Sequence, residues 1–309
     1  SPAVSWGVAF AWHVHPWEDL LDLVRRAEEF GYAAAFVDGD VTMLETRKDA
    51  AVLDGWTVTT ALLAHTQRIP IGSMRLVQHW NSARLAQVTA TAERLAPGRL
   101  RFLIATGDRK IDARFGFPAL PVSERIAWLD ETLTTLRSLW NGQTVTYAGR
   151  FVQLAGARVR PIPPGGRIPI AIAARGPRML DLVAAHADVW DVNLPPVPAR
   201  VGRAAADLEA ACRRRGRDPA EISRSMWIFT RVDEAAEAAL GEFRRLNPWF
   251  RSIPDEEVAK ALVVGGPERC REQLRALVGE LRIDHPVVDL SGLGAEASRR
   301  ALEALAPGK

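Results

Sequence analysis

Short apolar runs alternate with amphipathic helical stretches along the whole chain, and this alternation restricts the fold more than any other feature. Parallel strands that are buried on both faces read as continuous apolar runs. Eight strand–helix units in one chain favour a closed (β/α)8 barrel, the TIM barrel, over an open doubly wound sheet. The predicted strands are residues 4–10, 33–37, 68–74, 100–105, 168–173, 188–193, 223–230 and 285–290.

Two stretches interrupt this α/β pattern. Residues 144–160 alternate apolar and polar side chains around a glycine, which is typical of a β-hairpin. A later stretch that begins near residue 234 has helical periodicity. We therefore expect one barrel domain over residues 1–309, with a hairpin insertion at about 143–166 and a helical insertion at about 234–265.

Composition narrows the class of protein. The formal charge is +3, and basic residues are not interleaved with aromatic ones, so we expect no nucleic-acid partner. No segment has the run of about 18 apolar residues that a membrane helix needs, and no signal peptide opens the chain, so we expect no membrane partner. The two cysteines cannot form a disulfide framework, which favours the reducing cytoplasm.

In a β/α barrel the active site lies in the loops that follow the strands. After the first strand, His13 and His15 lie two residues apart, without an acidic or cysteine partner at metal-ligand spacing, so we expect no metal site. After the second strand comes Asp38-Gly39-Asp40. These carboxylates could bind a cation or transfer protons, or the segment could be only a tight turn.

The loops after the third and fourth strands combine donors, a cation and aromatic surface. The candidate residues there are Ser73, Met74, Arg75, Gln78, His79, Trp80, Thr106, Gly107 and Asp108. After the fifth strand, Ala174-Arg175-Gly176 precedes a helix that begins with proline. Free N–H groups at such a helix start bind phosphate, although proline is also simply favoured at the first helical position. No Walker loop, zinc-binding set or nucleophile elbow is present, and no nicotinamide fingerprint.

Residues 169–193 resemble the bacterial-luciferase-like superfamily, and most of all its branch that uses the deazaflavin coenzyme F420. Residues 69–74, 81–107 and 139–151 agree with the same family in the same order. The resemblance implies an oxidoreductase that transfers a hydride between F420 and a small organic substrate. An FMN-dependent monooxygenase of the same superfamily is the alternative. A barrel that only binds a small molecule is the alternative from another class.

The resemblance also assigns residues. Gly39 and Asp40 fall where family members usually carry Asp-His beside the ring, so Asp40 replaces the histidine. Ser73-Met74-Arg75 falls where the family often has a strained backbone with a non-prolyl cis peptide. Thr106 and Gly107 match the backbone beside the ring, and the small residues after the fifth strand match the phosphate loop. The cofactor-binding candidates are Gly39, Asp40, Ser73, Met74, Arg75, Thr106, Gly107, Ala174, Arg175 and Gly176.

The remaining candidates concern catalysis and the substrate. The acid–base candidates are Asp40, His79 and Asp108. The candidate pocket walls are Trp12, His13, Trp80, Trp190, Asn193 and Trp249, with residues 247–253 expected to roof the pocket. The family relation also implies a homodimer.

Overall fold

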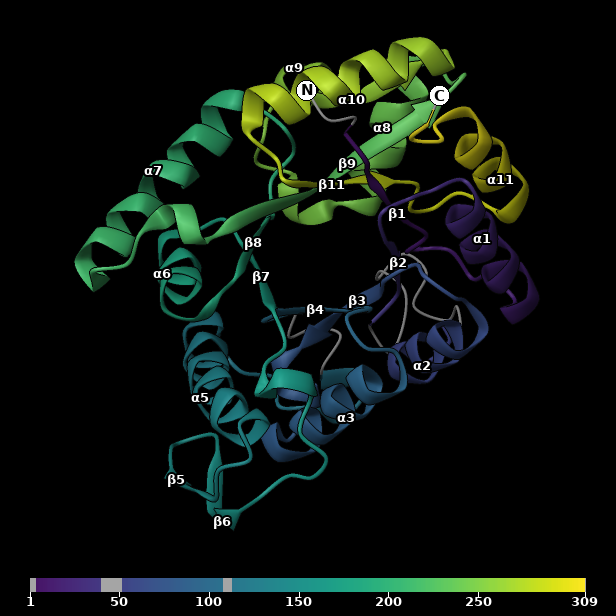
Figure 1. Cartoon of the computed structure of the whole chain (residues 1–309). Coiled ribbons are helices and arrows are strands. Elements are labelled where there is room, and N and C mark those ends of the chain that lie inside the picture. Colours follow the sequence, from purple (N-terminus) through teal and green to yellow (C-terminus); the bar gives the residue numbers. More distant parts are fainter. Residues whose placement is uncertain (1–3, 40–51, 108–112, 309) are drawn as a thin grey trace.

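In the computed structural model, which describes residues 4–39, 52–107 and 113–308, eight parallel strands pair side by side around a closed barrel (Figure 1). The barrel closes because β1 pairs with both β2 and β11, and β8 pairs with β9. This confirms the predicted (β/α)8 TIM barrel. The strands are β1 (Gly7–Ala9), β2 (Ala35–Val37), β3 (Ile71–Leu76), β4 (Leu100–Ala105), β7 (Ile170–Ala174), β8 (Val189–Val192), β9 (Ser223–Val232) and β11 (His285–Asp289).

Helices surround the barrel and begin at the residues that the sequence marks as helix starts. The side chains of Asp54 and Asn81 accept backbone N–H bonds from Thr57 and Arg84, which caps α2 and α3. Proline opens α6, α7 and α10, where its missing N–H costs nothing. The helices that follow barrel strands are α1 (Trp17–Glu29), α2 (Gly55–His65), α3 (Ser82–Leu95), α5 (Val122–Trp140), α6 (Pro177–His186), α7 (Pro198–Arg215), α10 (Pro267–Leu281) and α11 (Ala295–Ala304). Short 3-10 turns occur at η2 (Val77–His79), η3 (Pro164–Gly166), η4 (Pro219–Glu221) and η5 (Pro248–Phe250).

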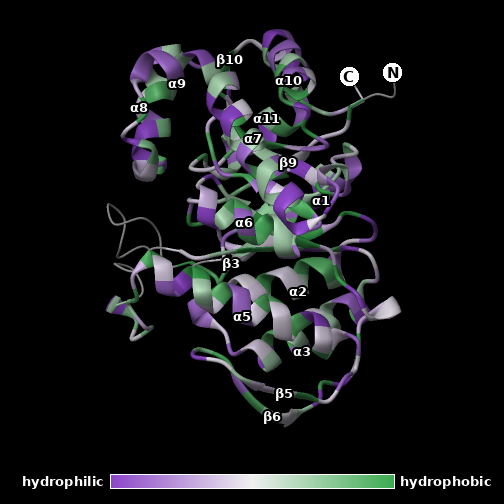
Figure 2. Cartoon of the chain, turned by 90° about the vertical axis from the view of Figure 1, so that its left-hand side faces the viewer, coloured by the Kyte–Doolittle hydropathy of each residue, from purple (hydrophilic) through white to green (hydrophobic). Residues whose placement is uncertain are grey.

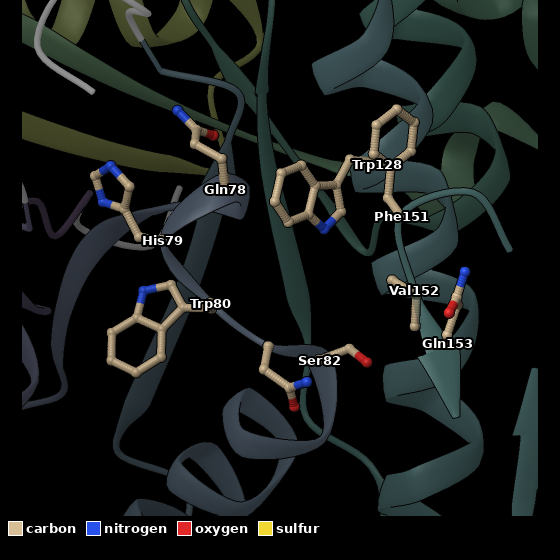
Figure 3. A pocket seen from close by; sticks show the side chains of 9 residues that line it. Gln78, His79, Trp80, Ser82, Trp128, Phe151, Val152 and Gln153 are labelled. Carbon is tan, nitrogen blue, oxygen red and sulfur yellow. The ribbon is translucent and has the colours of Figure 1, made fainter. Parts of the chain in front are cut away.

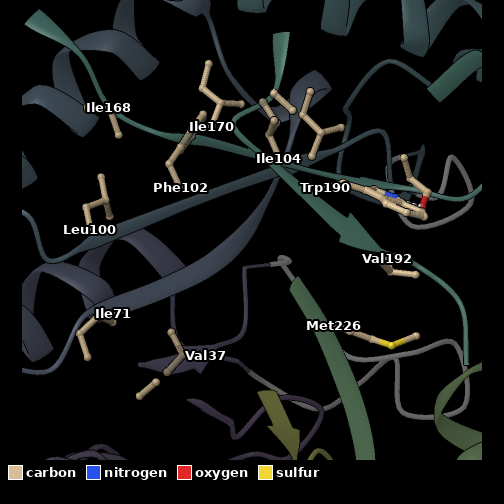
Figure 4. Packing of buried hydrophobic residues seen from close by; sticks show 14 of the residues in the cluster. Val37, Ile71, Leu100, Phe102, Ile104, Ile168, Ile170, Trp190, Val192 and Met226 are labelled. Atoms are coloured by element: carbon tan, nitrogen blue, oxygen red, sulfur yellow. Dashed lines mark hydrogen bonds between the residues drawn. The ribbon is translucent and has the colours of Figure 1, made fainter. Parts of the chain in front are cut away.

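The side chains of each strand alternate between the barrel interior and the helices. Outward-facing residues of the strands form one large cluster with the helices, part of which is shown in Figure 4. Ala9, Phe36 and Val287 face inward and pack together, and Leu76, Leu103 and other inward residues form a second group nearer the strand ends. Because the period of a strand is two residues, this register decides which side chains can reach a ligand in the barrel.

The first insertion is the predicted hairpin, formed by β5 (Val145–Ala148) and β6 (Gln153–Ala157) in antiparallel pairing. The carboxylate of Glu131 on α5 holds its turn in place. It accepts the backbone N–H groups of Arg150, Phe151 and Val152 at 3.0, 2.8 and 2.8 Å. Figure 2 shows the hairpin beside α3 and α5, on the side of the barrel away from α8 and α9.

The second insertion is helical, as predicted, and contains α8 (Ala236–Leu246), η5 and α9 (Asp255–Ala261). It builds its own small core with Phe229, Phe243, Phe250 and Val258. It then ends in a strand that the sequence analysis did not predict, β10 (Val263–Gly265), which pairs in parallel with the end of β9. This pairing explains why β9 runs on to Val232, two residues past the expected end.

No helix in the described part of the chain is long and apolar enough to cross a bilayer.

We expect Glu131→Gln to lower the free energy of unfolding by about 1–3 kcal/mol, because one amide oxygen cannot accept all three N–H groups and at least one is left without a partner. Urea denaturation measures the change. Glu124→Gln is the matched control, since its ion pair with Arg150, at 2.7 Å, joins a side chain that is 67% exposed. Such a pair is worth under about 1 kcal/mol. Equal losses in the two variants would contradict the proposed anchoring role of Glu131.

Candidate active site

Four strand ends that carry predicted site residues are neighbours in the barrel. β2 pairs with β3, β3 with β4, and β4 with β7, all in parallel. Gly39, Thr106 and Arg175 therefore come after β2, β4 and β7, and Met74 lies in the second half of β3, near the same rim of the barrel. These four strands can be followed in Figure 1. The structure thus brings together the stretches that the sequence analysis assigned to the cofactor.

Two glycines let these strand ends approach closely. A Cβ atom on Gly39 would lie 1.8 Å from the carbonyl oxygen of Met74, so no other residue fits there. Gly107 has a φ of +68°, and a Cβ atom on it would lie 2.7 Å from a methyl carbon of Leu76. The ends of β2, β3 and β4 therefore form one continuous backbone wall.

Strand alternation separates the two adjacent candidates on β3. Met74 points into the barrel, where it packs against the group that contains Leu76, Leu103, Ala105 and Ala173. Ser73 points the opposite way. Its side chain is buried under α2, with its oxygen 3.5 Å from the hydroxyl oxygen of Thr59, so a contact of Ser73 with the cofactor would have to come from its backbone.

The strained backbone that the resemblance implied at Ser73-Met74-Arg75 is also not found. β3 pairs with β4 residue by residue from Ile71 to Leu76, without a bulge. Within the described ranges the cis peptide bond is Arg160–Pro161. β3 ends at Leu76, two residues later than predicted. The side chain of Arg75, another cofactor-binding candidate, lies outside the described part.

Asp38, which the sequence offered together with Asp40 for proton transfer but which was not among the final site candidates, carries a partly buried carboxyl group at this rim. It directly follows Val37, the last residue of β2. One of its oxygens accepts the backbone N–H of Trp12 at 3.0 Å. Burial raises the pKa of Asp38 to about 7, with the Trp12 bond acting in the opposite direction. A carboxyl group with a pKa near neutrality can both give and take a proton at physiological pH.

Two inward carboxyl groups lie near the ends of their strands. Asp191 on β8 accepts a hydrogen bond from the Ser225 hydroxyl at 2.9 Å, and burial raises its pKa to about 6. Asp289 ends β11 and accepts the Ser291 N–H at 2.9 Å, and burial raises its pKa as well. The alternation of the strands would have indicated Asp191 and Asp289, because each occupies an inward position within an apolar strand.

The loop after β1 supplies an aromatic group above this rim. Trp12, with a φ of +58°, lies against Trp249 of the helical insertion, with ring centroids 6.3 Å apart. Trp249 in turn contacts Phe250 at 6.0 Å. Two predicted pocket residues, Trp12 and Trp249, are therefore brought together from segments far apart in the chain.

His13 and Asp38 line one cavity of about 260 Å3 together with His15. The two histidine rings are 4.6 Å apart. His15 is only 8% exposed, and burial, followed by the nearby His13, lowers its pKa to about 4. The His15 ring is therefore neutral at physiological pH. The other described residues that line this cavity are apolar: Phe10, Val14, Pro16, Leu20, Val37, Val52, Leu53 and Val58.

His79 and Trp80 lie away from Asp38. His79 stacks on Phe117 at 4.0 Å, and Trp80 packs edge-on against Trp56 at 6.1 Å. Both line a second cavity, of about 250 Å3, which is shown in Figure 3. The structure therefore does not bring His79 together with the residues around Asp38.

The start of α6 has the form expected of an anion site. Gly176 is its N-cap residue, Pro177 is its first helical residue, and a Cβ atom on Gly176 would meet open space. The guanidinium of Arg175 lies over the ring of Phe250, 5.3 Å from its centroid. A helix of ten residues presents its positive end and its free N–H groups at this point.

The carbonyl oxygen of Ala174 is already occupied. It accepts the indole N–H of Trp190 at 2.9 Å and the backbone N–H of Asn193 at 3.2 Å. Trp190 is fully buried among outward-facing core residues, so the prediction that it forms a pocket wall is corrected. Asn193 remains half-buried beside the strand end.

Asp40 and Asp108 lie outside the described residues.

Comparisons with known proteins agree with this geometry. Residues 5–251 match the model of the family described as luciferase-like monooxygenase. The F420-dependent glucose-6-phosphate dehydrogenase of Rhodococcus erythropolis is 29% identical over 276 residues, which cover 79% of this chain and 78% of that enzyme. The enzyme of the same name from Nocardia farcinica is 33% identical over 174 residues, covering 55% of this chain and only 50% of that protein.

Solved structures show the same fold. An F420-dependent secondary alcohol dehydrogenase in complex with an F420-acetone adduct has a TM-score of 0.79 at 18% identity, with 98% of this chain and 99% of that chain covered. EDTA monooxygenase from Chelativorans sp. BNC1 has a TM-score of 0.80 at 14% identity, with 98% and 93% covered. With more than half of its length matched by the family model, the chain belongs to the luciferase-like monooxygenase family.

We expect Asp38→Asn to stabilise the fold in a pH-dependent way. The folded pKa of about 7 exceeds the value of about 3.9 in an unfolded chain, so folding takes up a proton between these pH values. Ionisation of Asp38 in the folded state therefore lowers the free energy of unfolding very little near pH 4 and by the full amount well above pH 7. The advantage of the asparagine, which keeps the acceptor for Trp12, should grow by about 3–4 kcal/mol from pH 4.5 to pH 8.

Chemical denaturation at the two pH values measures this difference. Asp207→Asn, at an exposed position on α7, is the control and should show the same offset from the wild type at both. An advantage of Asp38→Asn that does not change with pH would mean that Asp38 is not buried in its neutral form.

Proposed function

We propose that this chain is an F420-dependent oxidoreductase that transfers a hydride to or from a small organic substrate. The observation that carries the proposal is the placement of an open helix start, at Gly176, on the same rim as the buried carboxyl group of Asp38. The first site suits a phosphate and the second suits proton transfer. The names of the relatives, which are F420-dependent dehydrogenases, support this cofactor.

The residues present fit such a cofactor. The N–H groups at the start of α6 would hold its phosphate, with the exposed Arg175 and Arg178 adding positive charge. Met74, Ala105 and Ala173 offer a small apolar wall against which a flat ring can lie. When bound, F420 would supply the hydride chemistry.

The chain's own residues would position the reactants and handle the proton. Asp38 is our candidate to give or accept the proton of the substrate hydroxyl, because its pKa lies near neutrality. Asp40 and Asp108 stay as further candidates. Trp12 and Trp249 would exclude water above the ring, and His13 and Asn193 would contact the substrate. His79 faces the second cavity, and we assign it no role in this step.

An FMN-dependent monooxygenase remains the second candidate function. Its support is the fold likeness to EDTA monooxygenase and the departure at Gly39-Asp40, where the resemblance led us to expect Asp-His. A spectroscopic assay separates the two. We expect oxidised F420 to lose its absorbance when the purified protein is mixed with a panel of small alcohols. Oxygen consumption with reduced FMN, and no reaction with F420, would favour the monooxygenase.

We expect Gly176→Ala to weaken F420 binding about tenfold or more, because its methyl group fills the space beside the α6 N–H groups and removes a charge-assisted contact with the phosphate. Fluorescence titration measures the dissociation constant. Gly202→Ala on α7 is the matched control, since a Cβ atom there also meets open space. Binding that is equally strong in both variants would place the phosphate elsewhere.

We also propose a cytoplasmic homodimer built from single-domain chains. Support for the compartment comes from Cys212 and Cys270, which are both free and buried. The family resemblance supports the dimer. Light scattering of the purified protein measures its mass. We expect the mass of two chains, and the mass of one chain would contradict the dimer.

A further inference from the structure

The second cavity lies outside the site described above. It has a volume of about 250 Å3, and its described lining comes from the segment after β3, the start of α3, α5 and the hairpin. Figure 3 shows Gln78 and His79 of η2, with Trp80 that follows them, on one side and Trp128 with the hairpin on the other. A cavity of this volume holds a ligand with one ring and a small head group.

The hairpin side of the cavity is rigid. Phe151 stacks on Trp128 with centroids 5.5 Å apart and planes only 9° from parallel. The backbone that carries Phe151 is fixed to α5 by the three hydrogen bonds to Glu131. This wall therefore presents a preformed aromatic surface, which favours a flat ring over a flexible chain.

The floor of the cavity is the start of α3, a helix of fourteen residues. Asn81 caps it by accepting the N–H of Arg84, which satisfies one of its first N–H groups. The next residue, Ser82, is 2% exposed, and its hydroxyl has no hydrogen-bond partner in the part of the chain that the structure describes. In Figure 3 this hydroxyl points towards the side of Val152 and Gln153. A buried hydroxyl without a partner costs about 1–3 kcal/mol, and a ligand oxygen would remove that cost.

The charge around the cavity favours an anion. None of the described residues that line it is Asp, Glu, Lys or Arg. Two charged groups lie behind the Phe151 wall: the guanidinium of Arg150, 5.0 Å from the Phe151 ring centroid, and the carboxylate of Glu131, which accepts three backbone N–H groups. The positive end of α3 adds to the attraction for an anion. The amides of Gln78 and Gln153 add hydrogen-bonding groups at its edges. We propose that this cavity binds a small planar aromatic carboxylate, with its ring on the Trp128–Phe151 wall and its carboxylate at the start of α3 beside Ser82.

The cavity also adjoins the barrel rim. A Cβ atom on Gly107 would lie 2.8 Å from the side-chain nitrogen of Gln78, so this amide packs directly against the backbone that follows β4. A ligand that contacts Gln78 from the cavity side therefore lies one residue away from the proposed cofactor wall. The binding itself does not depend on the proposed oxidoreductase activity.

Calorimetric titration of the purified, cofactor-free protein with sodium benzoate tests the proposal. We expect benzoate to bind more tightly than benzyl alcohol, which has the same ring without the charge. Ser82→Ala should weaken benzoate about tenfold, because it removes a hydrogen bond to a charged acceptor. Gln87→Ala, at an exposed position on the same helix and outside the cavity, should leave binding unchanged.

A second variant tests the aromatic wall. Phe151→Leu should weaken benzoate and leave the binding of cyclohexanecarboxylate unchanged, since only the aromatic ring gains from stacking. Thermal unfolding of each variant shows whether it is folded. The proposal is overturned if benzoate produces no binding heat with the wild type, if benzyl alcohol binds as tightly, or if folded Ser82→Ala binds benzoate like the wild type.

Discussion

Closure of eight parallel strands forces every strand side chain either into the barrel or against the helices, and this constraint determines which residues can reach a ligand. On β3 it sends Met74 inward and Ser73 under α2. On β2 it sends Val37 to the helices, and Asp38 follows directly at the rim, where its carboxyl group is desolvated. Desolvation then raises the pKa of that carboxyl group towards neutrality. The same geometry that builds the core thus produces an acid–base group at the rim.

The insertions complete this arrangement from opposite sides of the barrel. The helical insertion places Trp249 against Trp12 and Phe250 beneath the guanidinium of Arg175, so it contacts both the loop after β1 and the start of α6. The hairpin instead packs on α5 and shapes a separate cavity. Gly39 lies too close to the backbone of Met74, and Gly107 too close to the side chains of Leu76 and Gln78, for either position to carry a side chain. The wall proposed for the cofactor therefore combines these bare backbone positions with the small group of Met74, Ala105 and Ala173.

The sequence predicted the architecture well because buried parallel strands and amphipathic helices have different periodicities, and eight repeats leave little ambiguity. It also located the start of α6, since proline after glycine marks a helix start. It failed where the answer depends on which face of a strand a residue occupies. Ser73 and Trp190 face the helices, and of the three aspartates at the strand ends only Asp38 was considered, beside Asp40, while Asp191 and Asp289 were not. β10 was missed because three residues carry too little periodicity.

The proposed function requires that one rim of the barrel hold both the planar ring and the phosphate of the cofactor. A crystal structure of the protein grown with F420 tests this most directly. The account predicts density for the ring against Met74 and the backbone of Gly39 and Gly107, with the phosphate at the N–H groups that begin α6. A phosphate bound at another helix, or a ring outside the barrel end at which β2 and β3 finish, would contradict it.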